Sequence, residues 1–256
     1  MRKSMNYINS KYFKFQNIKY GFFTRKGGYS KKPYDTLNCS NKYNDKLLNV
    51  KKNRKKALIE VKLNKKKLII GEQFHSNKTI IIKNKILNKL KADAFITKNK
   101  DLAIGILTAD CAPIFFFDDE KKIIGAAHAG WKGSLKNICK TTVKSMRMIG
   151  SKNKDINVII GPCINYKNYE VDNKFFDKFI KKNKDYKKFF KKKNNNKYYF
   201  KLGPLLRYQL QKLKVKKIVL LNEDTFSNKS KFYSHRRMTI HNESATGRLI
   251  NIIGFS

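Results

Sequence analysis

The chain has 256 residues, 41% of them hydrophobic, which is enough to bury a core in one large domain or two small ones. No stretch approaches the roughly 18 apolar residues of a membrane-spanning helix, and the polar N-terminal sequence lacks the apolar segment of a signal peptide. A cytoplasmic protein without a membrane partner is therefore expected. The net charge of +41 comes mostly from lysines spread along the chain. Together with abundant Asn and Ile, this pattern indicates an A/T-rich genome rather than a dedicated nucleic-acid role.

The first quarter of the chain predicts strands, a turn and a helix. Residues 11–24 are rich in aromatic side chains with partial alternation, which predicts one or two strands. Residues 25–30 contain paired glycines and predict a turn, in which Arg25 either holds an anion or is a solvated surface residue. A helix capped by Asp45 is expected to run to about residue 61. Its inward side is assigned to Leu48, Ala57, Leu58 and Val61.

The next segment predicts a histidine between two short strands. The strands are expected at residues 68–72 and 79–82, and His75 lies in the tight connection between them. Such connections often present ligands, although a hydrogen-bonded loop histidine is the alternative interpretation.

The central part of the chain predicts four successive strands and a helix. Short turns separate the strands, so an antiparallel or mixed sheet is expected, with strands at 93–97, 102–107, 112–117 and 122–127. Ser134 is expected to cap a helix to about residue 149. Its inward side would include Cys139, which is therefore assigned to the core.

The last third of the chain is less informative. Another strand is expected at residues 157–160, and the lysine-rich segment 173–196 predicts a surface helix and a loop. A helix from Pro204 through Leu213, a strand at 217–222 and a final strand or helix at 246–253 complete the expected elements. No repeat or linker is visible, so residues 1–256 are expected to form a single domain.

Two apolar runs in the centre each deliver one side chain of metal-binding type, Cys111 and His128. Zinc prefers Cys sulfur and His nitrogen, and catalytic zinc sites use three protein ligands. His75, Cys111 and His128 would supply three, whereas His235 and His241 lie in a basic C-terminal turn and are poorer candidates. On spacing alone, the thiol and imidazoles are either core residues or a site.

Two neighbours of these side chains leave alternatives open. Asp110 can orient a ligand histidine, or it can pair with Lys or Arg at the end of a strand. Residues 128–134 combine a strand, a glycine turn and a helix start. Such a start suits a phosphate, to which Lys132 adds charge, but the turn can also simply pack Trp131 against the sheet.

Six sequence segments then point to a known family. They are Phe23-Thr-Arg-Lys-Gly-Gly-Tyr-Ser30, Gln73-Phe-His75, Thr108-Ala-Asp-Cys-Ala-Pro113, Ala127-His-Ala-Gly-Trp-Lys-Gly133, Ile160-Gly-Pro-Cys163 and Thr246-Gly-Arg248. In this order they resemble the YfiH family, also called laccase-domain or polyphenol-oxidase-like proteins. The likeness runs from about residue 20 to the C-terminus. It implies a single α+β domain in which a layered, mixed β-sheet packs with helices.

The resemblance also implies a site and an activity. It implies a zinc ion held by His75, Cys111 and His128, and phosphorolysis of adenosine, inosine, guanosine or S-methyl-5′-thioadenosine, with accompanying adenosine deaminase activity. Purine nucleosides and inorganic phosphate would be the ligands, and the protein would be a monomer or homodimer. Cations must place the phosphate. The candidates in this sequence are Arg25, Lys132, Arg237 and Arg248.

Three other functions are weighed beside this one. A Cys-His hydrolase or amidase, related to peptidoglycan editing, would use Cys111 as nucleophile and His128 as base. Copper is a less favoured metal, because copper oxidases typically use many histidines in His-x-His pairs and this chain has four histidines and no such pair. A basic RNA- or DNA-binding protein would instead show steep salt-dependent binding.

Overall fold

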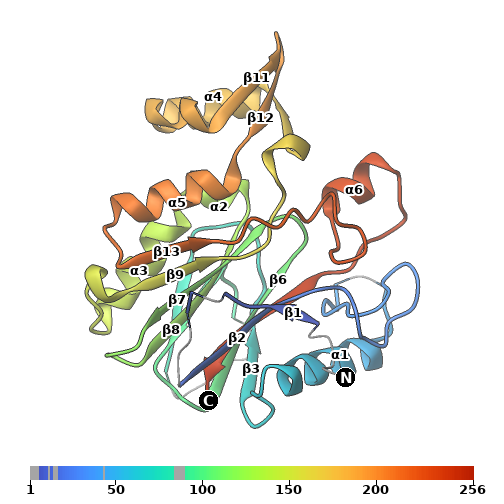
Figure 1. The fold of residues 1–256 in the computed structure, drawn as a ribbon, viewed down its shortest axis with the longest axis vertical. Coiled ribbons are helices and arrows are strands. Elements are labelled where there is room, and N and C mark those ends of the chain that lie inside the picture. Colours follow the sequence, from blue (N-terminus) through green and yellow to red (C-terminus); the bar gives the residue numbers. More distant parts are fainter. Residues whose placement is uncertain (1–5, 11, 14–16, 43, 84–89) are drawn as a thin grey trace.

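The computed structural model describes residues 6–10, 12–13, 17–42, 44–83 and 90–256. Two β-sheets form the centre of the molecule (Figure 1). The first has five strands in the order β1 (Tyr7–Ile8), β2 (Ile18–Phe23), β14 (Leu249–Phe255), β6 (Leu102–Thr108) and β3 (Lys67–Ile70). Only the pair of β3 and β6 is parallel, so this sheet is mixed.

The second sheet has six strands and is also mixed. Their order is β13 (Lys217–Leu220), β9 (Asn157–Ile160), β7 (Ala112–Asp118), β8 (Ile123–Ala129), β5 (Ala94–Thr97) and β4 (Thr79–Ile82). The pairs β13–β9 and β4–β5 are parallel, and the others are antiparallel.

The two sheets pack face to face through alternate side chains of their strands. On β7, Phe115 and Phe117 join the core between the sheets, whereas Ile114 and Phe116 face the helices on the other side. Phe115 stacks on Phe22 of β2, with ring centroids 4.5 Å apart. Because both faces of β7 are buried, its sequence is a continuous apolar run rather than an alternating one.

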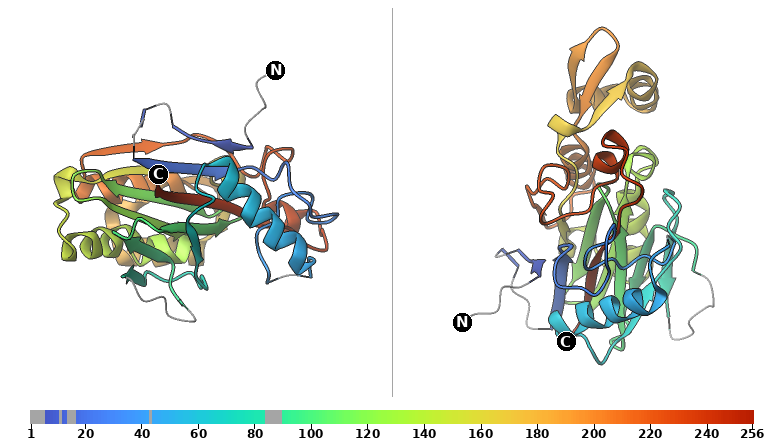
Figure 2. Two further views of the ribbon diagram at one scale, coloured as in Figure 1. Left: turned by 90° about the horizontal axis from the view of Figure 1, so that it is seen from below. Right: turned by 90° about the vertical axis from the view of Figure 1, so that its right-hand side faces the viewer.

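Helices cover the outer faces of both sheets. Helix α1 (Leu47–Glu60) packs Ala57 and Leu58 against the outer side of β14. Helices α2 (Trp131–Leu135), α3 (Ile138–Met148) and α5 (Leu202–Lys212) cover the six-stranded sheet (Figures 1 and 2). The result is a helix–sheet–sheet–helix arrangement, which confirms the expected α+β class with layered mixed sheets.

A smaller unit, here called the arm, extends from this sandwich (Figures 1 and 2). It contains the short helices η2 (Tyr166–Asn168) and η3 (Lys184–Phe189), the strands β10 (Glu170–Asp172), β11 (Phe190–Asn194) and β12 (Lys197–Phe200), and helix α4 (Asn173–Lys182). The sequence predicted a helix and a loop here, but β11 and β12 form a hairpin. Its strands were missed because lysines fill β11, where apolar alternation is the usual signal.

Helix starts differ from the prediction in two places. Asp45 does not cap α1: its Oδ2 accepts hydrogen bonds from Ser30 Oγ at 2.6 Å and Asn38 Nδ2 at 2.8 Å. Leu48 is 62% exposed, so its inward assignment is wrong, whereas Ala57, Leu58 and Val61 are buried as expected.

The predicted helix 134–149 is two helices. Ser134 lies inside α2, where its Oγ donates to the carbonyl of Trp131, so it caps nothing. Asn137, with φ of +57°, separates the helices and accepts a hydrogen bond from Lys140 N at the start of α3. Asparagine tolerates this left-handed conformation and is a favoured cap, which explains the break. Cys139 is fully buried, as expected.

Most strand predictions are confirmed. Strands β4 and β9 have the predicted bounds, and 246–253 contributes to a strand rather than a helix. Part of the predicted 11–24 strand lies outside the described residues. The four central strands all exist, but β6 belongs to the other sheet. The turn from β6 to β7 therefore carries the chain from one sheet to the other. Within the described ranges, no helix is long and apolar enough to cross a membrane.

The remaining elements are η1 (Asn153–Asp155) and α6 (His235–Ile240). Helix α6 begins at Ser234, whose side chain accepts a hydrogen bond from the backbone N–H of Arg237.

Candidate metal centre

Three side chains meet where the chain passes between the sheets. His75 lies in the connection from β3 to β4, and Cys111 lies in the turn from β6 to β7. His128 is near the end of β8 and stands opposite Pro113 of β7 in the sheet register. Both connections and the end of β8 therefore come together at one edge of the sandwich, which is why residues distant in sequence become neighbours.

The geometry of the three side chains suits a tetrahedral metal. Their ligand atoms all lie within 4.8 Å of one another, and Cys111 Sγ is 3.9 Å from His75 Nε2. Ordinary zinc–sulfur and zinc–nitrogen bonds in a tetrahedron place such atoms about 3.6 Å apart. A small closure would thus complete the site. Among the described residues this is the one group of His, Cys, Asp and Glu with such spacing, and it leaves a fourth position open.

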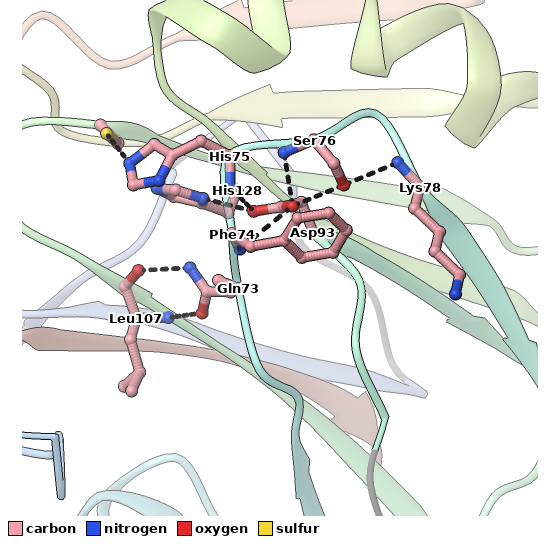
Figure 3. A network of polar contacts seen from close by, with 9 residues as sticks. Gln73, Phe74, His75, Ser76, Lys78, Asp93, Leu107 and His128 are labelled. Carbon is pink, nitrogen blue, oxygen red and sulfur yellow. Dashed lines mark hydrogen bonds and ion pairs between the residues drawn. The ribbon is translucent and has the colours of Figure 1, made fainter.

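Asp93, just before β5, organises the two histidines (Figure 3). Its Oδ1 lies 2.9 Å from His128 Nδ1 and accepts a hydrogen bond from the backbone N–H of His75 at 3.0 Å. Its Oδ2 accepts from both the N–H and the hydroxyl of Ser76, each at 2.7 Å. The carboxylate is fully buried. It fixes the tautomer of His128 and turns Nε2 toward the site, as carboxylates do in many metal centres.

The sequence analysis missed this residue. The available signal was an acid at the start of an apolar strand, where an unpaired charge is costly and a specific partner is required.

The electrostatics of the site favour a thiolate. Burial alone would raise the pKa of Cys111, but His128 and His75 overcome it and lower that pKa. Burial alone would lower the pKa of His128, but Cys111 and Asp93 raise it. Burial would also raise the pKa of Asp93, yet hydrogen bonds from His128 and Ser76 lower it to about 2. A deprotonated thiol is the form that binds metals and attacks electrophiles.

Backbone geometry and a glycine define the space around the site. His75 has φ of +61°, an uncommon conformation for a histidine, and the hydrogen bonds of Asp93 hold the loop in it. The Gln73 side chain adds a second brace, because it both donates to and accepts from the backbone of Leu107 at 2.8 Å (Figure 3). A Cβ atom on Gly130 would lie 2.8 Å from Cys111 Sγ and 3.0 Å from His75 Cδ2. Glycine is therefore required there by close approach.

Asp110 has a different role from either one expected. Its carboxylate accepts hydrogen bonds from the Thr225 hydroxyl at 2.7 Å, the Ser234 hydroxyl at 2.9 Å and the backbone N–H of Arg236 at 2.6 Å. The prediction that it orients a ligand histidine is wrong, since Asp93 does so, and no ion pair to Asp110 is found in the described part of the chain. Asp110 instead ties the start of α6 to the turn that carries Cys111.

Two cavities meet at the three side chains. The first cavity, of about 580 Å³, is lined by Ser40, Asn41, Lys42, Arg54, Ile70, Gly71, Glu72, Gln73, His75, Leu90, Leu107, Ala109, Cys111, His128, His235 and Arg248. The second cavity, of about 590 Å³, is lined by His75, Ala109, Asp110, Cys111, Trp131, Lys132, Ile164, Tyr169, Glu170, Val171, Asp172, Phe175, His235, Arg236 and Thr239. Their common wall consists of His75, Ala109, Cys111 and His235.

The predicted cations separate into two pairs. Arg248 lines the first cavity and Lys132 lines the second. Arg25 lines neither: its Nε donates to the carbonyl of Asp35 at 2.7 Å. Arg237 is 5% exposed, lines neither cavity and donates hydrogen bonds to the carbonyls of Thr225, Phe226 and Phe232.

Sequence reasoning missed several residues that line the cavities. His235 was set aside as a poorer candidate, yet it lies on the common wall. Arg54 and Arg236 were not considered. Their only signal was charge, which a chain with 59 Lys and Arg residues offers nearly everywhere.

Comparisons with known proteins bear on the whole chain. A purine nucleoside phosphorylase named YlmD from Bacillus subtilis is 32% identical over 91% of this chain and 87% of its own length. One from Haemophilus influenzae is 30% identical over 98% and 100% of the two chains. One from Rickettsia prowazekii, RP494, is 36% identical over 57% of this chain, and the match covers 61% of that protein.

Solved structures show the same fold. The Neisseria meningitidis protein NMB0706 superimposes with a TM-score of 0.88 at 25% identity, covering 98% of this chain and 99% of that one. The Bacillus licheniformis protein YfiH superimposes with a TM-score of 0.83 at 29% identity, covering 93% of each chain. Residues 19–256 match the family described as multi-copper polyphenol oxidoreductase laccase. The chain therefore belongs to this family, the YfiH family.

Proposed function

We propose that the protein is a purine nucleoside phosphorylase that depends on zinc held by His75, Cys111 and His128. Its substrates are adenosine, inosine, guanosine and S-methyl-5′-thioadenosine with phosphate, and adenosine deaminase activity accompanies it. The observation that carries the proposal is the meeting of these three side chains on the wall shared by two cavities. Similarity to proteins named purine nucleoside phosphorylase supports the reaction class.

The chain's own residues account for binding and orientation in this reaction. A phosphate oxygen attacks C1′ while the bond from C1′ to the purine breaks, and positive charge develops on the sugar. Of the predicted cations, Arg248 and Lys132 line the cavities and are assigned to the phosphate. Arg25 and Arg237 hold the surrounding backbone instead. A bound zinc ion would supply a Lewis acid beside the reacting centre and activate water for deamination.

The metal test follows from the donor set. A thiolate and two imidazoles also suit copper, so metal analysis must precede any assignment. We expect protein purified without added metal to contain about one zinc per chain, as a three-ligand site predicts. A copper content equal to the protein content would contradict the zinc assignment.

The activity test uses inosine and adenosine, each with and without phosphate. Phosphate-dependent release of free base and pentose 1-phosphate is the expected result, with ammonia released from adenosine. Cys111→Ala and His128→Ala should lose zinc and both activities. Cys139→Ala is the matched control, because Cys139 is fully buried away from the site. Full phosphorolysis by a metal-free Cys111→Ala protein would contradict the proposal.

A second candidate function rests on one specific observation. Asp93, His128 and Cys111 form an acid–histidine–thiol series in which the thiol pKa is lowered, as in cysteine hydrolases and amidases. In that case Cys111 is the nucleophile and His128 the base, and peptidoglycan-related amides are suitable substrates. Amide hydrolysis by metal-free protein, abolished by added zinc and by alkylation of Cys111, would favour this function over phosphorolysis.

A further inference from the structure

The two cavities differ in chemistry. The side chains that line only the second cavity include three aromatic ones, Trp131, Tyr169 and Phe175. The first cavity has no aromatic ring apart from the histidines. It has three cationic side chains, Lys42, Arg54 and Arg248, and one acid, Glu72. A flat aromatic ligand and a multiply charged anion therefore find different surroundings on the two sides of the common wall.

The aromatic wall of the second cavity is assembled from two parts of the fold. Trp131 begins α2, immediately after the strand that carries His128, and Phe175 comes from α4 of the arm. Their ring centroids are 5.0 Å apart. Trp131 is only partly buried, so one part of its indole packs on the arm while another lines the cavity. A ring held by packing on one side loses little freedom when a ligand stacks on it.

The second cavity also offers a hydrogen-bond donor. Arg236 lines it, and one terminal nitrogen of its guanidinium donates to the carbonyl of Glu170 at 2.8 Å. Its Nε is buried and has no hydrogen-bond partner among the described residues. A buried N–H without a partner is costly, and a ligand acceptor would remove that cost. Purine rings carry such acceptors at their ring nitrogens, and charge accumulates there as the base departs.

We propose that the second cavity binds the purine base, stacked on Trp131 and hydrogen-bonded by Arg236, while the first cavity receives the phosphate. The sugar C1′ then lies at the common wall, beside His75 and Cys111. This inference rests on the proposed function and narrows it: of the two phosphate candidates, Arg248 contacts phosphate, and Lys132 borders the base. The bond from phosphate oxygen to C1′ forms as the bond from C1′ to the purine nitrogen breaks, and the electron pair leaves with the purine.

The chain contains a single tryptophan, which makes the test direct. Saturable quenching of its fluorescence by hypoxanthine or adenine, with no added phosphate, is expected for wild-type protein. Base stacking on an aromatic side chain corresponds to about a five- to 150-fold change in affinity upon alanine substitution. By calorimetry, Trp131→Ala should weaken hypoxanthine binding by that factor, and Trp131→Phe, which keeps a ring, should restore most of it.

Variants on the two sides separate the cavities. Thr239→Phe fills the second cavity from α6 and should also weaken hypoxanthine binding, which guards against a Trp131→Ala protein that fails to fold. Arg54→Gln lies on the first cavity and should leave hypoxanthine binding unchanged while raising the KM for phosphate. Arg236→Lys should reduce kcat more than it changes the KM for phosphate.

The outcomes distinguish this inference from the proposed function. Bases that bind as described to a protein without phosphorylase activity support the cavity assignment and contradict the phosphorylase. Phosphorolysis with normal hypoxanthine binding in both Trp131→Ala and Thr239→Phe overturns the cavity assignment and leaves the phosphorylase standing.

Discussion

Asp93 Oδ1 lies 2.9 Å from His128 Nδ1, and the same carboxylate accepts the backbone N–H groups of His75 and Ser76. One buried acid therefore sets the position of two predicted ligands that are 53 residues apart in sequence, at 75 and 128.

Asp93→Asn should weaken zinc binding by about 10- to 100-fold, the usual effect of removing a carboxylate that orients a ligand histidine. An amide can present its NH₂ group to Nδ1 and favour the wrong tautomer. Competition titration with a zinc-binding dye measures the change. Asp224→Asn is the matched control, since Asp224 accepts hydrogen bonds from Asn165, Asn168 and Ser227 away from the site. Equal zinc affinity in the two variants would refute the role of Asp93.

The pH dependence of stability should also reveal Asp93. Its pKa in the folded protein is lowered to about 2 from a model value of 3.8, so its contribution is complete above the unfolded value and is lost as the pH falls through the folded one. In metal-free protein, the stability difference between wild type and Asp93→Asn should shrink by roughly 2 kcal/mol from pH ~4 to ~2. Urea unfolding at several pH values measures it. Parallel curves for the two proteins across this range would contradict the expectation.

Cys111 should be the one cysteine that reacts readily in the native, metal-free protein. Its pKa is lowered by His128 and His75, whereas burial raises the pKa of Cys39, Cys139 and Cys163 to about 12. Alkylation by iodoacetamide followed by peptide mass spectrometry should locate the label at residue 111, and zinc should protect it. Cys111→Ser should then take up no label until the protein is unfolded. Rapid labelling of a second cysteine in the folded state would argue against these environments.

Gly130→Ala should disturb the metal centre more than the fold. The added methyl group would lie within 3.0 Å of both Cys111 and His75, so one ligand must move. We expect a loss of zinc affinity on the order of tenfold, as for other changes that displace ligands. Gly133→Ala is a suitable comparison, because its nearest neighbour is the carbonyl of Ser76 at 3.2 Å. Unchanged zinc affinity in Gly130→Ala would show that the space is not limiting.

The four predicted cations should separate by phenotype. Arg248→Gln removes a cation from the first cavity and should raise the KM for phosphate by about 10- to 100-fold, the effect of losing one hydrogen bond to a charged group. Arg237→Ala leaves three carbonyls without their donor and should cost about 2–4 kcal/mol of stability. Steady-state kinetics and denaturant unfolding measure the two effects. Loss of stability in Arg248→Gln with unchanged KM would reverse the assignment.

The sequence alone predicted much of this fold because burial leaves a strong signal. The run Ala112–Asp118 is apolar throughout since both of its faces are covered, and its strand was predicted. The division of the central strands between two sheets was not predictable, because pairing is decided by contacts between distant segments. The arm hairpin escaped prediction because lysine-rich β11 carries no apolar alternation.

The same reasoning applies to the site. His75, Cys111 and His128 were identified as ligand candidates by residue type and by likeness to a family, and the fold brings them together. The sequence could not show that Asp93, rather than Asp110, faces His128. Position in the chain favoured Asp110, which adjoins Cys111, but a φ of +77° and three hydrogen bonds direct its carboxylate to α6.

The passage of the chain between its two sheets has a consequence for folding. His75 and Cys111 lie in two such crossings, so an ion bound to both would act as a rivet through the sandwich. Ion release and separation of the layers would then be coupled events, and a partly assembled chain with its layers apart would have no binding site to offer.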